Sequence, residues 1–370
     1  MARLPYLDNS SFLFIPFSFD KPNQYMDFCN AISDSGVWDP VNEKLMYFHK
    51  YVSDRLSGDI EKNRICRHYL LKQQAAESAG VYLNTQWYHT GKKTYQGQKG
   101  TFFDFRVMNV HLFCFRTSVC ILAFQIQFAN NDPKRIAAAQ YYLRRTSEVK
   151  IYLKAEYPVR ASDGITLMDL VKGLFVPYQK TFGIDYFFYT VPKAEKANFL
   201  TYVAVSSFDH HSEELYYLKW CYHDGFQYDD IADHADAENY YAARDILWGI
   251  SSNAAACLVC RDLGRKNFIE GSFQNNFMTQ YLFTYVLLLH QKYVMYLHLT
   301  KLSVNLDNEL IQMEEYKSRL YEFEKDFMYS HITEIPQYQQ FYERVSQILA
   351  LNQLFQDVQE PITQLADLRR

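Results

Sequence analysis

Alternating apolar and polar positions in residues 101–128 are the clearest structural signal in the chain. Apolar residues occupy every second position in two runs of this segment. The runs are Met108, Val110, Leu112 and Cys114, then Cys120, Leu122, Phe124, Ile126 and Phe128. Residues 116–118 separate the runs, so the pattern predicts a β-hairpin with its turn there. The other face of the return strand is apolar at first and becomes polar at Gln125 and Gln127. We therefore expect a central hairpin that is covered fully on one side and partly on the other.

Residues 1 to about 275 mix β-rich and helical segments, which predicts an α/β body with a central, largely antiparallel sheet. Asn131 and Asp132 before Pro133 mark a turn and the start of an amphipathic helix. Further strands are expected at 11–19, 81–89, 186–190, 198–206 and 255–260, and helices at 134–148, 165–175 and 212–223.

From about residue 276 the pattern predicts helices only, over 278–304, 306–330 and 336–370. Apolar residues of the last two recur at coiled-coil-like spacings: Leu306, Leu310, Met313, Tyr316, Leu320, Phe323 and Phe327, then Tyr338, Phe341, Val345, Ile348, Phe355, Ile362 and Leu365. The third helix would be about 50 Å long, with Pro361 kinking it or starting a new segment. The predicted layout is a body at 1–275 followed by a long three-helix stalk at 276–370.

Residues 281–299 form the most apolar stretch, yet they do not predict a membrane span. A spanning helix needs about 20 mostly apolar residues. Here His290, Gln291 and Lys292 would lie at the bilayer centre, where a lysine alone costs about 3 kcal/mol. We expect a long buried helix instead.

One polar line runs along this first C-terminal helix. Thr284, Gln291, His298 and Asn305 recur every seven residues, a spacing that drifts only about 20° per heptad. The line is either the solvated edge of a buried helix or an uncharged seam that faces a symmetry mate or a wet lumen.

Composition narrows the classes of protein. A net charge of −4 and a pI of about 6.3 do not favour binding to duplex nucleic acid. Seven scattered cysteines argue against a secreted disulfide framework, and the N-terminus lacks the pattern of a signal peptide. We therefore expect a cytoplasmic location. A hydrophobic content of 48% is enough to build a large core.

Two short motifs could carry metal chemistry. Cys257 and Cys260 form a lone CxxC without a second ligand pair, so they predict two buried strand cysteines rather than a zinc site. Segment 221–241 is the densest acidic region. Its carboxylates could bind Mg²⁺ or another divalent cation, or form a solvated loop. The candidate metal ligands are Asp229, Asp230, Asp233 and His234.

Basic residues in three segments could bind an anion such as a nucleotide phosphate, or form a charged surface. In 64–72 the basic residues lie near one face if the segment is helical. We expect a hairpin tip in segment 89–100, and 134–148 is the helix predicted after the central hairpin. The candidate ligand-binding residues are Arg64, Arg67, His68, Lys92, Lys93, Arg144 and Arg145. The chain has no P-loop, GxGxxG, GxSxG or HExxH motif, so nothing indicates an enzyme.

The helical segments 281–303 and 314–365 resemble the helical part of CorA-like proteins. They comprise a helix with the step "LLHQKY", a returning acidic helix and a long final helix, and the strand pair at 110–128 is similar to one in the same superfamily. The resemblance covers 109–130 and 277–370.

This resemblance implies a funnel-shaped cytosolic α/β domain on a stalk that leads into two transmembrane helices lining a pore. It also implies homopentamers, divalent cations between the cytosolic domains and a Gly-Met-Asn ion filter. Some divergent CorA-like proteins are membrane effectors in CRISPR-linked defence that respond to a nucleotide. This sequence contains neither Gly-Met-Asn nor a membrane hairpin, so no filter residue can be assigned.

Two explanations of that departure stay open. A membrane segment follows Arg370, with Arg369 and Arg370 as its positive cytoplasmic flank, or the protein is a soluble relative without a pore. The leading prediction is an oligomeric sensor domain of a CorA-like ion channel or transporter at the cytoplasmic face of a membrane. The alternative is a soluble oligomeric binding or scaffold protein.

Overall fold

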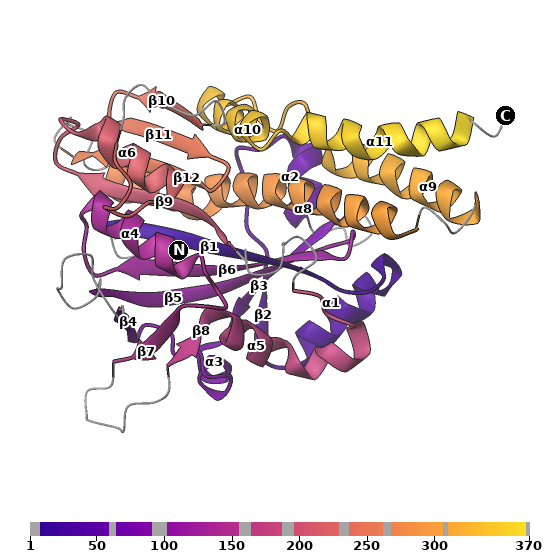
Figure 1. Cartoon of the computed structure of the whole chain (residues 1–370), viewed down its shortest axis with the longest axis horizontal. Helices are drawn as coiled ribbons and strands as arrows, with labels where there is room; N and C mark the ends of the chain where they lie inside the picture. Colours follow the sequence, from indigo (N-terminus) through magenta and orange to yellow (C-terminus); the bar gives the residue numbers. More distant parts are fainter. Residues whose placement is uncertain are drawn as a thin grey trace.

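A twelve-stranded sheet forms the centre of the protein (Figure 1). The computed structural model describes residues 8–58, 64–90, 102–154, 164–186, 196–228, 237–261, 268–305 and 310–367. The strands are β1 (Asn9–Ser18), β2 (Trp38–Val41), β3 (Cys66–Leu71), β4 (Gln86–Thr90), β5 (Phe102–Phe115), β6 (Val119–Phe128), β7 (Lys150–Leu153), β8 (Ile165–Thr166), β9 (Asn198–Val205), β10 (Ala237–Ala243), β11 (Ile246–Ser251) and β12 (Ala254–Cys260).

The strand order is β10-β11-β12-β9-β1-β6-β5-β4-β7-β8, with β3 also pairing with β5 and β2 with β3. The described pairs are antiparallel, except that β9 and β12 run parallel. The predicted α/β class with a largely antiparallel sheet is therefore confirmed.

Strands β5 and β6 form the predicted hairpin, with its turn at 116–118. The pairing shifts between Val107 and Asn109, which marks a β-bulge. Met108 is the extra residue of the bulge and has no partner in β6, so the alternation of side chains between the two faces is interrupted there. The buried face therefore continues through Val107 and Phe105, and the prediction that Met108 lies on it was wrong.

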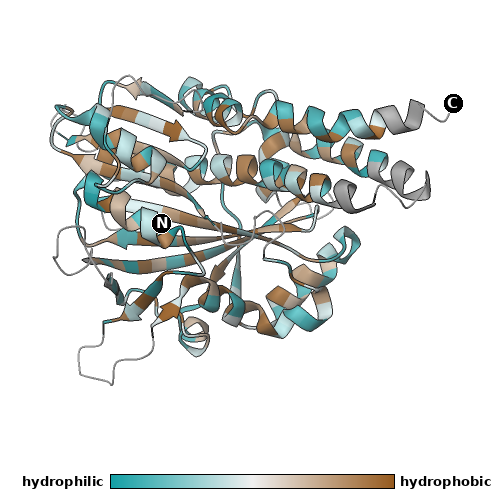
Figure 2. Ribbon diagram, in the orientation of Figure 1, coloured by the Kyte–Doolittle hydropathy of each residue, from teal (hydrophilic) through white to brown (hydrophobic). Residues whose placement is uncertain are grey.

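Helices cover both faces of the sheet, and each face has its own apolar cluster (Figures 1 and 2). Every residue of β1 is buried because alternate side chains enter the two clusters. The first cluster is covered mainly by α1 (Tyr25–Asp34), α4 (Pro133–Leu143), α5 (Leu167–Phe182) and α6 (His211–Trp220), with the short α3 (Gln73–Ser78) at its margin. The second is covered by α2 (Lys50–Ser57) and the C-terminal helices α8 (Leu282–Asn305), α9 (Leu310–Phe327), α10 (Pro336–Ile348) and α11 (Leu351–Asp367).

Local sequence signals start the helices of the first face. Asp132 caps α4 by accepting a hydrogen bond from the backbone N–H of Lys134, with Pro133 at the first helical position, as predicted. Thr166 and Asp169 form a capping box at the start of α5. The helices predicted at 165–175 and 212–223 are therefore confirmed as α5 and α6, with shifted ends.

The helix that leads into α8 contains two π-helical segments, Phe268–Phe273 and Phe277–Tyr281, on either side of α7 (Gln274–Asn276). Buried apolar residues recur there every four positions: Ile269, Phe273, Phe277, Tyr281 and Tyr285. In an α-helix, four residues turn the chain about 40° further than one full turn. The side chain of Tyr285, the last of the five, would therefore no longer point toward the sheet. A π turn holds more residues, which offsets this drift and keeps all five side chains in one cluster.

The structure does not confirm a long stalk. Helix α8 shares the second apolar cluster with β1, β5 and β6, and the third predicted helix is divided into α10 and α11, of 13 and 17 residues. The break lies at Ala350, whose φ of 51° is left-handed, while Pro361 lies inside α11 without ending it. Parts of α8, α9 and α11 extend past the sheet on the side of the C-terminus (Figure 1).

The polar line of α8 is buried inside the chain at two of its positions. Thr284 Oγ1 donates a hydrogen bond to the carbonyl of Gln280 at 2.8 Å, and Gln291 Nε2 donates one to the carbonyl of Phe327 at 2.6 Å. Both side chains are buried, so they are neither a solvated edge nor a seam facing another copy. As predicted for 281–299, no helix in the described ranges is long and apolar enough to cross a membrane.

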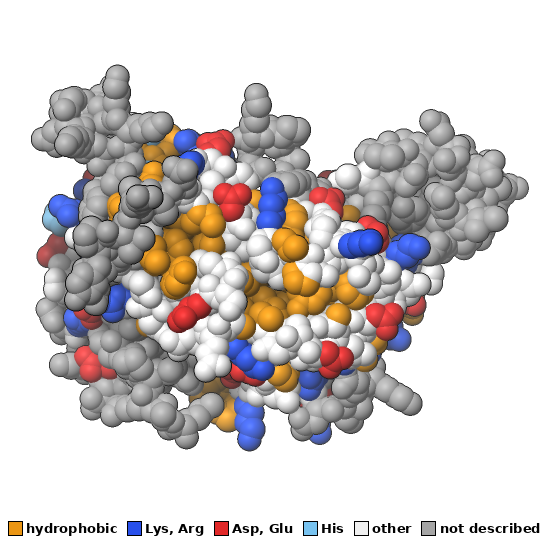
Figure 3. All heavy atoms as spheres, turned by 90° about the horizontal axis from the view of Figure 1, so that it is seen from below, with side chains coloured by type: hydrophobic (Ala, Val, Ile, Leu, Met, Phe, Trp, Pro, Cys, Tyr) orange, Lys and Arg blue, Asp and Glu red, His pale blue; other side chains and the backbone are white. Residues whose placement is uncertain are grey.

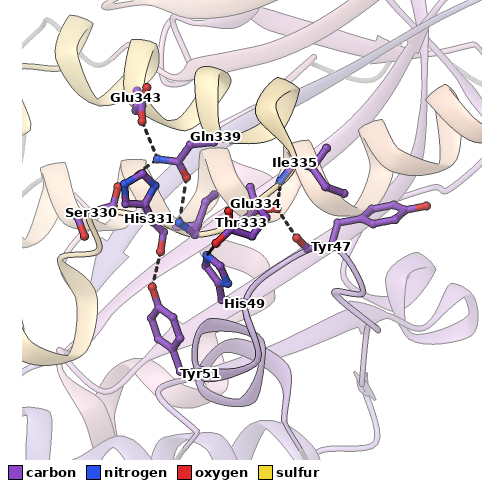
Figure 4. Close-up of polar contacts among 11 residues, drawn as sticks. Tyr47, His49, Tyr51, Ser330, His331, Thr333, Glu334, Ile335, Gln339 and Glu343 are labelled. Carbon is purple, nitrogen blue, oxygen red and sulfur yellow. Dashed lines mark hydrogen bonds and ion pairs between the residues drawn. The ribbon is translucent and has the colours of Figure 1, made fainter.

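A network of hydrogen bonds joins the start of α2 to the turn between α9 and α10 (Figure 4). The Tyr51 hydroxyl donates to the carbonyl of His331 at 2.5 Å, the His49 N–H donates to the carbonyl of Ile332 at 2.8 Å, and Thr333 Oγ1 donates to the carbonyl of Tyr47. These bonds tie the turn between α9 and α10 to the N-terminal half of the chain.

The face on which α1 and α5 lie has several apolar patches interrupted by charged side chains (Figure 3). Met26 of α1 and Val176 of α5 are among the exposed large apolar residues. Scattered residues of this kind are normal on folded surfaces.

Candidate functional site

A pocket of about 510 Å³ lies against the first apolar cluster, where the ends of β5 and β6 meet α4 and α6. It is called the main pocket here. Its lining residues are Phe103, Asp104, Phe128, Ala129, Asn130, Lys134, Arg135, Ile136, Ala138, Ala139, Tyr217 and Asp224. Sites for small molecules have volumes of about 300–1,000 Å³, apolar walls and a few polar groups, and the main pocket fits that description.

Strand alternation and helix spacing explain the apolar walls. Phe103 and Phe128 come from the strand positions that face the first cluster. Ala138 and Ala139 present a side-chain-poor surface of α4, so a ligand can approach the helix closely. Tyr217 of α6 closes the opposite side, and its hydroxyl donates to the carbonyl of Phe226 at 2.8 Å.

The charged groups at the pocket largely neutralise one another. Lys134 Nζ lies 2.8 Å from Glu213 Oε1 and 5.7 Å from the centre of the Tyr217 ring, and the hydrogen bond to Glu213 raises the pKa of Lys134. Arg135 lies 3.8 Å from the Asp132 carboxylate. The rim therefore offers polar contacts without a strong field of either sign.

Aromatic side chains continue from one wall of the main pocket. Phe103 stacks on Tyr142 with ring centres 6.3 Å apart, and Tyr142 stacks on His223 at the same distance. His89 lies 5.3 Å from Phe103 and 5.4 Å from Tyr142, and its Nδ1 bonds to the carbonyl of Lys150 at 2.7 Å. Burial lowers the pKa of His89, so the ring is neutral near pH 7 and acts as a flat apolar surface.

A second pocket of about 310 Å³ shares Phe128 and Ala129 with the main pocket. It is more polar, with Asp8, Gln86, Arg106, Gln127 and Asn131 among its lining residues. Gln86 Nε2 donates a hydrogen bond to Asp104 Oδ2 at 2.7 Å. Asp104 lines the main pocket and Gln86 lines the second pocket, so this hydrogen bond connects the walls of the two.

The basic residues predicted at 64–72 do not share a helical face, because the segment forms β3 rather than a helix. Arg64 donates to the carbonyl of Gly58 at 2.8 Å through Nε. Successive residues of a strand point to opposite faces, so Arg67 and His68 lie on opposite sides of the sheet. His68 is buried beside Phe283 of α8, whereas Arg67 donates to Met26 Sδ of α1 at 3.7 Å.

Arg144 is buried and bonded within the chain. Its guanidinium donates to the carbonyl of Ala197 at 2.8 Å and to Asn253 Oδ1 at 2.7 Å, with a longer bond to the carbonyl of Trp220 at 3.5 Å. Arg145 packs over the Tyr141 ring, 4.5 Å from its centre. Among the candidates that the structure describes, Arg64, Arg67, His68, Arg144 and Arg145 thus have different partners within the chain.

The remaining predicted ligands lie outside the described residues: Lys92, Lys93, Asp229, Asp230, Asp233 and His234. Within the described ranges, no three His, Cys, Asp or Glu side chains are arranged to hold a metal ion. Cys257 and Cys260 are buried free cysteines of β12, as predicted.

Sequence reasoning missed the pocket residues. Phe103, Phe128, Ala138 and Tyr217 come from four elements, and no local motif joins positions more than 100 residues apart.

Comparison with protein-family models, with curated proteins and with solved structures found no match.

Proposed function

We propose that this protein is a ligand-binding regulatory domain that binds a small organic molecule in the main pocket. The observation that carries the proposal is the pocket itself, with a volume of about 510 Å³, apolar walls and a charged rim. Its size and lining suit a ligand that buries most of its surface.

The position of the pocket supports a regulatory role. Its walls belong to the first apolar cluster, while the C-terminal helices pack on the second. Strands β5 and β6 contribute side chains to both clusters, including Phe103 on one face and Phe113 on the other. A ligand that binds one arrangement of these strands more tightly would shift the packing of α8, with a coupling of about 1–3 kcal/mol.

Filling the main pocket tests this proposal. Ala138 is partly buried on its wall, so Ala138→Trp should place an indole in the pocket. We expect fragments that bind the wild-type protein in ligand-observed NMR to lose at least tenfold in affinity. Val176→Trp is the matched control, because Val176 is 67% exposed on α5. The proposal is wrong if no fragment binds the wild type, or if Ala138→Trp binds the same fragments equally well.

A second candidate function rests on the C-terminal helices. Parts of α8, α9 and α11 extend past the sheet on the side of the C-terminus (Figure 1), and their sequences resemble CorA-like proteins. We propose on this basis that the domain serves a CorA-like ion channel or transporter as a homo-oligomer, with five copies implied by the resemblance.

Membrane association and assembly state test that second candidate together. In cells that express the complete gene, we expect the protein in the membrane fraction, and light scattering of the detergent-extracted protein should give the mass of five copies. A monomer found wholly in the soluble fraction would contradict the channel. A soluble oligomer would favour the binding or scaffold protein instead.

A further inference from the structure

The second pocket contains a row of three polar side chains from neighbouring strands. Gln86 of β4 and Gln127 of β6 are the pairing partners of Arg106 on either side of β5, and all three line this pocket. Residues directly opposite each other in antiparallel strands point to the same face, so the three side chains lie side by side. Arg106 points away from the first apolar cluster, because its neighbours Phe105 and Val107 belong to that cluster.

The carboxylates in and beside the second pocket have cationic partners other than Arg106. Asp8 lines the pocket and forms an ion pair with Arg261. Asp104 lies two residues before Arg106, on the same face of β5, and its Oδ2 is 3.3 Å from Lys154 Nζ. The negative charge nearest the row is therefore balanced without the Arg106 guanidinium.

Arg106 and Gln127 keep their polar groups available to a ligand. Arg106 is exposed and Gln127 is partly buried, and among the residues that the structure describes neither side chain has a hydrogen-bond or ion-pair partner. A guanidinium presents two parallel N–H groups to a carboxylate or a phosphate, and the Gln127 amide can add a third donor from the facing strand. The volume of about 310 Å³ leaves room for a small molecule at these donors.

We propose that the second pocket binds a small polar oxyanion, a carboxylate or a phosphate, through the Arg106 guanidinium and the Gln127 amide. This inference goes beyond the proposed function, because it concerns another pocket and a ligand of different chemistry. Neither residue lines the main pocket, so failure of either proposal leaves the other to its own test.

NMR of the protein with isotope-labelled arginine tests the contact on the wild type. The Nε–H signals of Arg106 and Arg135 are identified by their absence from Arg106→Gln and Arg135→Gln. We expect inorganic phosphate or malonate to shift the Arg106 signal with a dissociation constant at least tenfold lower than for the Arg135 signal, because charge-assisted hydrogen bonds hold the anion only at Arg106. Arg135 is the matched control, since its side chain is 73% exposed and lies outside the second pocket. The tighter-binding probe assigns the site to carboxylates or to phosphates.

Two further comparisons complete the test. Malonamide, the uncharged diamide of malonate, should leave the Arg106 signal in place. Gln127→Leu should weaken binding of the tighter anion at least fivefold, because one donor is lost. The proposal is wrong if neither anion shifts the Arg106 signal, if the Arg135 signal shifts at the same concentrations, or if malonamide acts as malonate does. Equal affinity in Gln127→Leu would overturn the assignment of that amide.

Discussion

Lowering the pH from 7.5 to 5.0 should destabilise this protein strongly, because three histidines are buried against the second apolar cluster: His68, His111 and His290. His68 and His111 lie side by side between the sheet and α8, with His68 Nε2 and His111 Nδ1 3.0 Å apart. His290 of α8 stacks on Phe115 at 3.8 Å between ring centres, and its Nε2 is 2.7 Å from Thr117 Oγ1.

Burial lowers the pKa of each of these histidines, to about 4 for His111. In the unfolded chain a histidine has a pKa of about 6.5. Between these values the unfolded state binds more protons than the folded state, so the free energy of unfolding falls as the pH falls below about 6.5. For His111 the loss at pH 5.0 is about 2 kcal/mol, since each pH unit below 6.5 is worth about 1.4 kcal/mol.

The other two histidines change stability in the same direction. His68 and His111 share a hydrogen bond, so protonation of one opposes protonation of the other and the pair titrates as a unit. Well above a pH of about 6.5 all three are neutral in both states, and we expect no further gain in stability from them there.

Urea unfolding at both pH values, followed by tryptophan fluorescence, measures this effect. His111→Phe keeps a ring beside Phe113 and removes one titrating group, so the difference between the two pH values should shrink by about 2 kcal/mol. His331→Gln is the matched control, because His331 is exposed, and it should leave the difference unchanged. An equal pH dependence in wild type and His111→Phe would show that burial of His111 does not control acid stability.

Local patterns in the sequence were sufficient to predict the elements whose partners lie nearby. The hairpin of β5 and β6 depends on residues 101–128 alone, and the start of α4 depends on Asp132 and Pro133. The strand order could not be predicted in this way. Strand β1 pairs with β6 and with β9, more than 100 residues away, and those pairings depend on which apolar faces can be covered together.

Errors arose where tertiary contacts override local spacing. The basic residues at 64–72 fit a helical face, but pairing of Leu70 with His111 and of Cys66 with Phe115 holds the segment as a strand. The seven-residue polar line of α8 was expected to face solvent or another copy. Gln291 instead satisfies a carbonyl at the end of α9, which lies beside it only in the folded chain.

The candidate site was the least predictable part, because ligand-binding residues were sought among charged groups. Charge alone does not reveal whether an arginine is available to a ligand. The main pocket depends instead on the alanines of α4 and on aromatic rings from β5, β6 and α6, and no local pattern in the sequence marks these residues as ligand-binding.

Arg144 was predicted as a ligand-binding residue, and its effect on stability tests whether its role is structural instead. Replacing it in Arg144→Met should lower the free energy of unfolding by about 3 kcal/mol, because removal of a buried charged partner leaves acceptors without bonds. The carbonyl of Ala197 and Asn253 Oδ1 would each lose their hydrogen bond to the guanidinium. Methionine is an unbranched side chain that fills part of the space, so the expected loss comes mainly from hydrogen bonds.

Arg145→Met is the matched control, because Arg145 is the next residue and is only partly buried over the Tyr141 ring. A cation over an aromatic ring at such a site contributes about 0.5–1 kcal/mol, so its loss should be much smaller. Urea unfolding of the two variants at pH 7.5 measures the difference. Similar losses in both variants would contradict the structural role of Arg144. A stable Arg144→Met protein would return Arg144 to the candidates for binding an anion, since the fold would then not need its charge.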